Sequence, residues 1–261
     1  MSDMDLETDI IPAESGDLFG SSYSSWKGWE SESFGGISAR DRATYTRELR
    51  EVRKIMSGDI RNVLEIGFGQ GSFLAYCREQ GWQATGTEAS EPLVTAAEQA
   101  GFPVKLAGDA FNLPDAAFDL IAGFDVIEHI PQSEMLPFLA LLRRKLKPGG
   151  TIFLRFPNAD SWLGNQNFNG DPTHVTAMGH FKLEYFCQRA GLEIISFRPE
   201  ARLGFDGGLA KGIHALIAGP ISSVLGWITK AIYFPRSRMV LASANVVACL
   251  RPVKSEGRGV G

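Results

Sequence analysis

The best candidate for a ligand site in this chain is a turn built from three alternate glycines. Residues 63–66 form a short apolar run typical of a buried strand, and Gly67, Gly69 and Gly71 follow before a helical pattern begins. Because glycine lacks a Cβ atom, a ligand can lie directly against this backbone. The following helix offers unpaired N–H groups as donors. We therefore predict that the turn binds a nucleoside-bearing cofactor.

Glu65 and Ser72 narrow the choice of cofactor. The dinucleotide fingerprint is G-x-G-x-x-G, which requires glycine at position 72, where this chain has Ser72. Glu65 stands two residues before the first glycine, and its negative charge would repel a pyrophosphate and attract a cationic group. The pattern therefore favours a cofactor with a cationic part.

Four stretches together resemble a known family. The run Glu65-Ile66-Gly67-Phe68-Gly69-Gln70-Gly71 resembles the first motif of class I S-adenosylmethionine-dependent methyltransferases. Glu88, then Gly108-Asp109-Ala110, then Leu146-Lys147-Pro148-Gly149-Gly150 match later motifs of that family in order, over roughly residues 60 to 200. The resemblance implies a Rossmann-like doubly wound seven-stranded sheet, mostly parallel with an antiparallel final strand. It also implies S-adenosyl-L-methionine as cofactor.

The resemblance assigns cofactor-binding roles along the chain. Glu88 would accept hydrogen bonds from both ribose hydroxyls, since a carboxylate has two acceptor oxygens; alternatively it is a solvated strand end. Asp109 would accept from the adenine amine, the Ala110 backbone would meet the ring edge, and Phe111 would cover the ring or pack in the core. The full predicted cofactor-binding set is Glu65, Gly67, Gly69, Gly71, Glu88, Asp109, Ala110, Phe111 and Asp125.

Two histidines are candidates for proton transfer. The Glu128-His129 pair resembles the subgroup that includes ubiquinone-pathway and sugar methyltransferases, which places His129 near the reacting methyl. His174 falls in a predicted polar loop, with Asp171 nearby to orient its ring. We predict His174 as general base ahead of His129. The alternative is that both histidines only order their loops. The polar residues of this predicted acceptor loop are Asn165, Gln166, Asn167 and Asn169.

These assignments predict methyl transfer to a hydroxyl of a small or glycan-linked acceptor. N-methylation of an amino sugar or small amine is one alternative, and a cofactor-binding domain without turnover is another. We predict no metal site, because His129, Asp171 and His174 come from separate loops and lack a local ligand pattern.

The elements that must position these residues alternate regularly, which predicts a parallel sheet covered on both faces. Strands are predicted near 62–66, 83–88, 103–106, 118–124, 150–156, 192–198 and 240–250, and helices near 40–56, 71–80, 91–100, 132–146 and 179–190. Ser90 has the sequence position of an N-cap. Gly81, Gly101, Gly149 and Gly191 are predicted to end helices.

Composition limits the remaining possibilities. The chain has 261 residues, of which 44% are hydrophobic and 21% charged, as in ordinary folded proteins. Its net charge of −4 argues against a broad nucleic-acid surface. The three cysteines, Cys77, Cys187 and Cys249, fit no metal spacing and are predicted to be reduced core thiols. With an acidic start unlike a signal peptide, the chain is expected to be cytoplasmic.

The predicted organisation is a flexible tail over 1–22, a cap and helix over 23–57, a methyltransferase domain over 58–253, and a tail over 254–261. The aromatic run 23–29 is expected to cover the sheet edge, or alternatively to act as a lid.

An inserted helical segment near 207–235 carries an apolar stripe over 209–233. Pro220 and several glycines argue against one long helix there, and the segment reads as too short and broken to span a membrane. We expect the stripe to pack on the domain or in a homodimer. The alternative is peripheral membrane contact, since Lys211, Lys230, Arg236 and Arg238 flank the segment.

Overall fold

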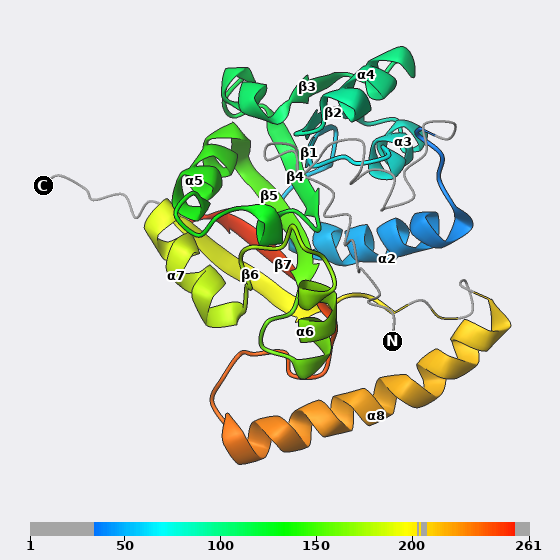
Figure 1. The fold of residues 1–261 in the computed structure, drawn as a ribbon, viewed down its shortest axis with the longest axis vertical. Coiled ribbons are helices and arrows are strands. Elements are labelled where there is room, and N and C mark those ends of the chain that lie inside the picture. The colour runs from blue at the N-terminus through cyan, green and yellow to red at the C-terminus, as the bar shows by residue number, and fades with distance from the viewer. Residues whose placement is uncertain (1–33, 203, 205–207, 254–261) are drawn as a thin grey trace, which may run out of the picture.

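A computed structural model describes residues 34–202, 204 and 208–253. Seven strands form one sheet in the order β3-β2-β1-β4-β5-β7-β6 (Figure 1). Strands β1 to β5 pair in parallel, whereas β7 is antiparallel to both β5 and β6. The strands are β1 (Asn62–Ile66), β2 (Gln83–Glu88), β3 (Val104–Leu106), β4 (Phe118–Phe124), β5 (Leu146–Pro157), β6 (Leu192–Pro199) and β7 (Asn245–Pro252). The predicted fold class is confirmed.

The helices follow the predicted alternation with two exceptions. They are α2 (Ala39–Ile55), α3 (Ser72–Glu79), α4 (Glu91–Gln99), α5 (Met135–Lys145), α6 (Trp162–Asn169), α7 (His180–Ala190) and α8 (Leu209–Tyr233), with short 3-10 helices η2 (Ala107–Asn112) and η3 (Ile127–His129). Helix α6 replaces part of the predicted polar loop; the Ser161 hydroxyl caps it by accepting from the Leu163 N–H. Helix α8 runs unbroken through Pro220, against our expectation.

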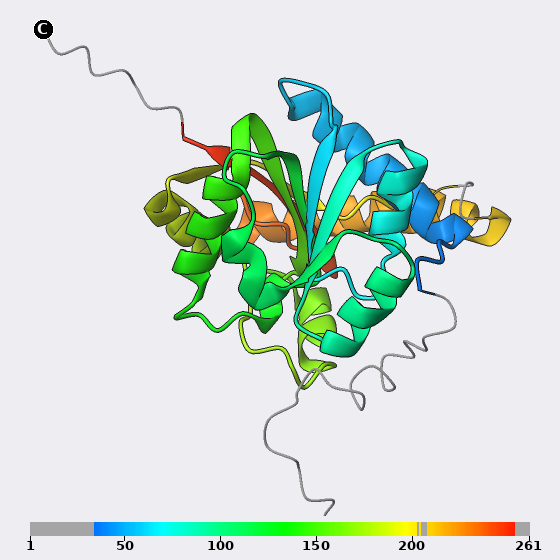
Figure 2. The same ribbon diagram turned by 90° about the horizontal axis from the view of Figure 1, so that it is seen from above.

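Alternate residues of each central strand enter two different cores, because successive side chains point to opposite faces of a sheet. Leu64, Ile121 and Ile152 pack with α5 and α7 on one face. Val63 and Leu120 pack with α2 and α3 on the other. Figure 2 shows these two helical layers on either side of the strands. Helix α4 covers a third, smaller core beside β3.

Three of the four predicted helix ends are correct. Gly81, Gly101 and Gly191 follow α3, α4 and α7 and have the positive φ that this position favours. The prediction for Gly149 is wrong, because α5 ends at Lys145 and Gly149, although its φ is also positive, lies within β5. Ser90 does precede α4, but its side chain makes no capping hydrogen bond. Its Oγ is instead buried and has no hydrogen-bond partner within the described part of the chain.

Two predictions lie outside the described residues: the aromatic cap over 23–29 and the tails at 1–22 and 254–261. The three cysteines are all described, and each is free and buried.

Candidate active site

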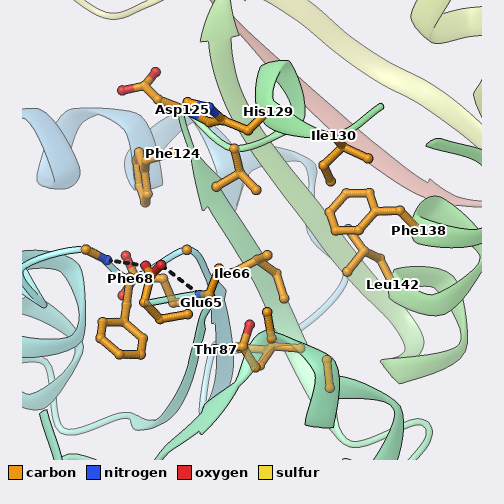
Figure 3. Close-up of a pocket in the computed structure, with 18 of the residues that line it drawn as sticks. Glu65, Ile66, Phe68, Thr87, Phe124, Asp125, His129, Ile130, Phe138 and Leu142 are labelled. Carbon is orange, nitrogen blue, oxygen red and sulfur yellow. Dashed lines mark hydrogen bonds between the residues drawn. The ribbon is translucent and has the colours of Figure 1, made fainter. Parts of the chain in front are cut away.

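A cavity of about 790 Å³ opens beside the carboxyl ends of β1, β2 and β4, within the size range of small-molecule sites. Its two sides differ in character. Ile130, Phe138 and Leu142 lie together on one side, and Glu65 lies on the other, below the end of β4 (Figure 3). The cavity therefore has an apolar wall on one side and, on the other, a carboxylate set among the aromatic rings of Phe68 and Phe124 (Figure 3).

The glycine turn has the conformation that its sequence predicts. Gly67, Gly69 and Gly71 all have φ between 53° and 75°, the left-handed region that favours glycine. Space adds a second requirement, because a Cβ on Gly67 would come within 2.7 Å of the Val126 side chain. The Gly67 N–H donates to the Thr87 carbonyl at 2.7 Å, which joins the turn to β2.

Glu88 holds the turn in place through backbone N–H groups. One carboxylate oxygen accepts from the Gly69 N–H at 3.0 Å, and the other accepts from Ala89 at 2.8 Å and Ser90 at 3.2 Å. Glu88 lines the cavity, so its carboxylate could also reach a ribose bound there, as predicted. The sequence did not predict that the same side chain also fixes the turn.

Glu65 is a buried carboxylate that faces the cavity. It is 3% exposed, and its Oε2 has no hydrogen-bond partner in the described residues. Burial, reinforced by the charge of Glu88 and opposed by a bond from the Leu74 backbone, raises the pKa of Glu65 well above its ordinary value. A cationic group in the cavity would give this carboxylate the partner it lacks. The residues therefore fit S-adenosylmethionine, which carries cationic centres.

Arg155 and Asp125, which both line the cavity, belong to a network of ion pairs that the sequence did not reveal. Arg155 of β5 pairs with Asp125, and with Glu200 at 3.1 Å. Burial acts to lower the pKa of Arg155, but the Asp125 and Glu200 charges outweigh it and raise the pKa above its usual range. Asp125 lines the cavity and has φ of +55°, a conformation uncommon outside glycine and found at functional sites.

Tyr45 of α2 also lines the cavity, and no sequence motif indicated it. Its ring packs against Phe73 at 5.1 Å and Phe124 at 5.2 Å between centroids. Burial, with the charge of Glu65 second, raises the pKa of Tyr45, so its hydroxyl stays protonated and can donate a hydrogen bond.

Two of the three residues predicted to bind adenine lie at the cavity. Ala110 and Phe111 line the cavity, whereas Asp109 is exposed and is not among the lining residues. Lys145 holds this segment: its buried Nζ donates to the carbonyls of Phe111, at 2.9 Å, and Leu113, and pairs with Asp115 at 2.8 Å. Lys145 lies within α5, and nothing in its sequence position predicted this role.

His129 is placed on the cavity wall by a chain of hydrogen bonds. The Thr173 hydroxyl donates to Asp171 at 2.6 Å, so its oxygen acts as acceptor toward His129 Nδ1 at 3.0 Å. The Thr173 carbonyl, which can only accept, lies 3.2 Å from the same nitrogen. Both contacts place the imidazole proton on Nδ1 and make Nε2 the basic nitrogen.

His174 has a different environment. Its side chain is only 6% exposed, and it is not among the residues that line the cavity. Its Nδ1 donates to the Phe168 carbonyl at 2.9 Å, and its ring meets His129 edge-on at 4.7 Å between centroids. Asp171 lies 3.7 Å from Nε2, as predicted, but its shorter contacts are to Thr173. Of the two histidines, His129 therefore lines the cavity and His174 lies behind it.

The histidines lie closer together than their sequence separation suggested. Potential ligand atoms of Glu128, His129 and His174 all lie within 4.8 Å of one another, so the group could hold a cation. Separation along the chain is therefore not an argument against a metal site.

The predicted acceptor loop does not line the cavity. Asn165, Gln166, Asn167 and Asn169 belong to α6 and its end, and none is a lining residue. The wall beyond His129 is apolar instead, formed by Ile130 and Pro131 and, from α5, by Pro137, Phe138 and Leu141.

Comparisons with known proteins agree with this arrangement. A family model described as "Methyltransferase domain" matches residues 38–197. A probable S-adenosylmethionine-dependent methyltransferase of Mycolicibacterium smegmatis is 28% identical over 51% of this chain and 52% of its own length. A ubiquinone biosynthesis O-methyltransferase of Paramagnetospirillum magneticum is 32% identical over 34% of this chain and 38% of its own length. The chain thus spans about half, or less, of these two relatives.

Solved structures extend the likeness of fold beyond that range. A S-adenosylmethionine-dependent methyltransferase from Archaeoglobus fulgidus superimposes with a TM-score of 0.58 at 23% identity, covering 80% of this chain and 93% of the other. A second, from Clostridium acetobutylicum, gives a TM-score of 0.56 at 10% identity and covers 89% and 99%. At these identities the likeness concerns the fold alone.

Proposed function

Because the chain belongs to the methyltransferase-domain family of class I S-adenosylmethionine-dependent enzymes, we propose that it methylates a hydroxyl of a small or glycan-linked acceptor, with His129 as general base. The observation that carries this proposal is the hydrogen-bond chain from Asp171 through Thr173 to His129. It orients the ring and fixes its tautomer beside the cavity, as a base requires.

S-adenosylmethionine supplies a methyl group on a sulfonium sulfur, already activated toward a nucleophile. The protein's own task is to bind, orient and remove a proton. Glu88 would hold the ribose hydroxyls, and Glu65 would pair with a cationic part of the cofactor. His129 would take the acceptor's hydroxyl proton at Nε2 while the acceptor oxygen forms its bond to the methyl carbon. The apolar residues of α5 would help to exclude water.

The name of one relative supports the choice of oxygen. The Paramagnetospirillum protein is named an O-methyltransferase, and its similarity covers 96 residues. We extend that chemistry to this chain as part of the proposal. An amine acceptor has less need of a base, whereas this chain holds His129 in one tautomer.

The test compares two histidine variants that share one neighbourhood. A fractionated cell extract with radiolabelled S-adenosylmethionine would first identify the fraction that accepts methyl. His129→Ala should then lower turnover on it by about 10²- to 10⁴-fold, the usual contribution of a positioned base. The matched control, His174→Ala, should lose less, because that ring does not line the cavity. Equal losses in the two variants, or wild-type turnover in His129→Ala, would exclude His129 as the base.

A second pair of variants tests the orientation of the ring. Thr173→Val removes the hydroxyl acceptor of His129, whereas Thr173→Ser keeps it. Thr173→Val should slow turnover by about 2- to 12-fold, since one hydrogen bond contributes about 0.5 to 1.5 kcal/mol. Thr173→Ser should restore the rate and the acidic limb of the pH profile. Calorimetric affinity for the cofactor should change little in either variant.

A further inference from the structure

Helix α8 is an insertion with an unusual surface. It lies between β6 and β7, and Gly212–Tyr233 is long and apolar enough to cross a membrane by length and composition. The 18-residue apolar stretch within it has no buried residue among those described. In Figure 1 it lies beyond the end of the sheet where β6 stops and β7 begins. The domain therefore leaves the large apolar side chains of this helix uncovered.

A helix that packs on a core turns its large apolar side chains inward, whereas α8 turns them outward. Small residues face the domain: a Cβ on Gly219 would lie 3.5 Å from the Arg202 guanidinium, and one on Gly226 would lie 3.4 Å from Ala242. The large apolar side chains face outward at 41–72% exposure, and they are Leu209, Ile213, Leu216, Ile217, Ile221, Val224, Leu225, Trp227, Ile228, Ile232 and Tyr233. This exposure contradicts packing of the stripe on the domain.

Two candidates remain for covering the apolar stripe of α8, a second copy of the chain and a lipid surface, and the charge of the segment distinguishes between them. From residue 208 to residue 253 the chain has no aspartate or glutamate. Over 209–244 it has four cations, namely Lys211, Lys230, Arg236 and Arg238. A symmetric contact between two α8 helices would bring cations together without any acid to pair them. An anionic lipid headgroup supplies the missing negative charge.

The C-terminal end of α8 has the residues of an interfacial anchor. Trp227 and Tyr233 are each 70% exposed, Phe234 follows, and the exposed Arg236 and Arg238 come next. Aromatic rings with adjacent cations are typical of the boundary between headgroups and acyl chains.

The topology decides that α8 would lie in this boundary rather than cross it. Pro199, at the end of β6, pairs with Val246, at the start of β7, so the chain leaves and returns at one sheet edge. If α8 crossed the bilayer, residues 234–244 would have to cross back without helical or sheet hydrogen bonds. Lipid does not tolerate such backbone.

We propose that α8 docks this protein on an anionic phospholipid bilayer, lying in the headgroup boundary with its apolar stripe inserted. The docked edge is also the edge of the active site. Pro157, at the carboxyl end of β5, pairs with Asn245, so α8 attaches where the parallel strands end and the cavity opens. This edge faces the bilayer, and the apolar wall of Phe138 and Leu141 suits an amphipathic acceptor held there. The acceptor part rests on the proposed function.

Vesicle flotation of the full chain tests the docking. The protein should float with phosphatidylcholine–phosphatidylglycerol vesicles and remain unbound with phosphatidylcholine alone. Arg236→Gln and Arg238→Gln should each weaken binding about fivefold, the contribution of one cation near an anionic surface. Ile221→Glu with Trp227→Glu should abolish flotation. The matched control, Tyr185→Glu, changes a 57% exposed ring on α7 and should float like wild type.

Three results would overturn the docking. The first is that the wild type does not float, and the second is that the Ile221→Glu, Trp227→Glu variant floats like the wild type. The third is that the wild type is a dimer that binds no vesicles and that these two substitutions convert it to a monomer. Equal melting temperatures of variant and wild type would show that the domain remains folded.

A separate readout tests the acceptor. With vesicles of bacterial lipid extract and labelled S-adenosylmethionine, the label should enter the organic phase. Label in water-soluble products alone would overturn the amphipathic acceptor and leave the docking intact. Flotation without transfer to any acceptor fraction would count against the proposed function instead.

Discussion

The Glu65 side chain is expected to destabilise the ligand-free protein and to stabilise the complex with a cationic cofactor. Its carboxylate is buried beside Glu88, and one oxygen lacks a partner among the described residues. Desolvation disfavours the charged form, whereas a bound cation would favour it. Cofactor binding and the ionisation of Glu65 are therefore coupled.

This coupling predicts a pH-dependent stability that Glu65→Gln removes. Because the pKa of Glu65 is raised in the folded state, its contribution to stability is complete below about pH 4.3, the unfolded value. That contribution falls as the pH rises through the folded pKa. Ligand-free Glu65→Gln should melt about 2 to 4 °C above wild type at neutral pH for each kcal/mol recovered. The two should converge near pH 4 in scanning calorimetry.

The same variant should bind the cofactor more weakly. Loss of one charge-assisted bond costs about 1.5 to 3 kcal/mol, or roughly 10- to 150-fold in affinity. Unchanged binding would show that Glu65 does not face the cation, and a melting difference independent of pH would show that the pKa of Glu65 is not raised in the folded protein.

Glu88 and Asp109 form a matched pair of acids, one inside the cavity and one outside. Glu88→Ala should weaken S-adenosylmethionine binding by at least tenfold, since it removes the proposed ribose acceptor and the partner of the Gly69 N–H. Asp109→Ala should leave affinity unchanged because Asp109 does not line the cavity. Titration calorimetry decides the matter. A loss of affinity in Asp109→Ala would support its predicted contact with adenine, and unchanged affinity in Glu88→Ala would exclude Glu88 as the ribose acceptor.

At the scale of elements, helix α5 holds the side of the cavity that contains Phe111 through Lys145. Lys145→Met keeps the length of the side chain and loses the ammonium that bonds the Phe111 and Leu113 carbonyls. It should destabilise the protein by about 2 to 3 kcal/mol, since bonds to charged groups contribute about 1.5 to 3. Hydrogen exchange should accelerate in residues 107–115 more than in β4. Uniform acceleration would indicate general unfolding instead.

Local sequence patterns were enough to predict the elements whose conformation is set by residues close together in the chain. The strands follow from short apolar runs, and the glycine turn follows from three residues that all require positive φ. Helix α6 was missed because its asparagines and glutamine are polar, while the features that support it are the Ser161 cap and burial of Gly164. Pro220 and Gly219 each weaken a helix locally, yet α8 continues through both of them.

Long-range contacts account for what the sequence could not provide. Arg155, Tyr45 and Lys145 come from three separate elements, and none has a motif that points to the cavity. The sequence did not show that His129 lines the cavity and His174 does not, since which ring reaches the cavity depends on how residues 171–176 pack against η3. Thr176 and Val175 both donate backbone N–H groups to the Glu128 carbonyl, and this pairing is invisible in sequence.

For the whole molecule, the three thiols are built-in reporters of unfolding. Cys77, Cys187 and Cys249 are buried in the two main cores. Burial raises the pKa of Cys187 and of Cys249 to about 12, and raises that of Cys77 as well. Since the thiolate is the reactive form, native protein at pH 8 should resist alkylation, whereas denaturant should expose all three thiols. Mass spectrometry counts the adducts. Rapid modification of one thiol in native buffer would reveal local opening of its core.

The order of strands has a consequence for how the chain is made. Strand β7 is the last of the seven to be synthesised, yet it lies between β5 and β6. In the nascent chain, both β5 and β6 therefore present open edges. They could also pair directly with each other through α7, as a right-handed crossover of the kind that sheets favour. Folding must postpone or undo that pairing until residues 245–252 arrive, so the final strand locks the sheet and sets when the nascent chain ceases to be prone to aggregation.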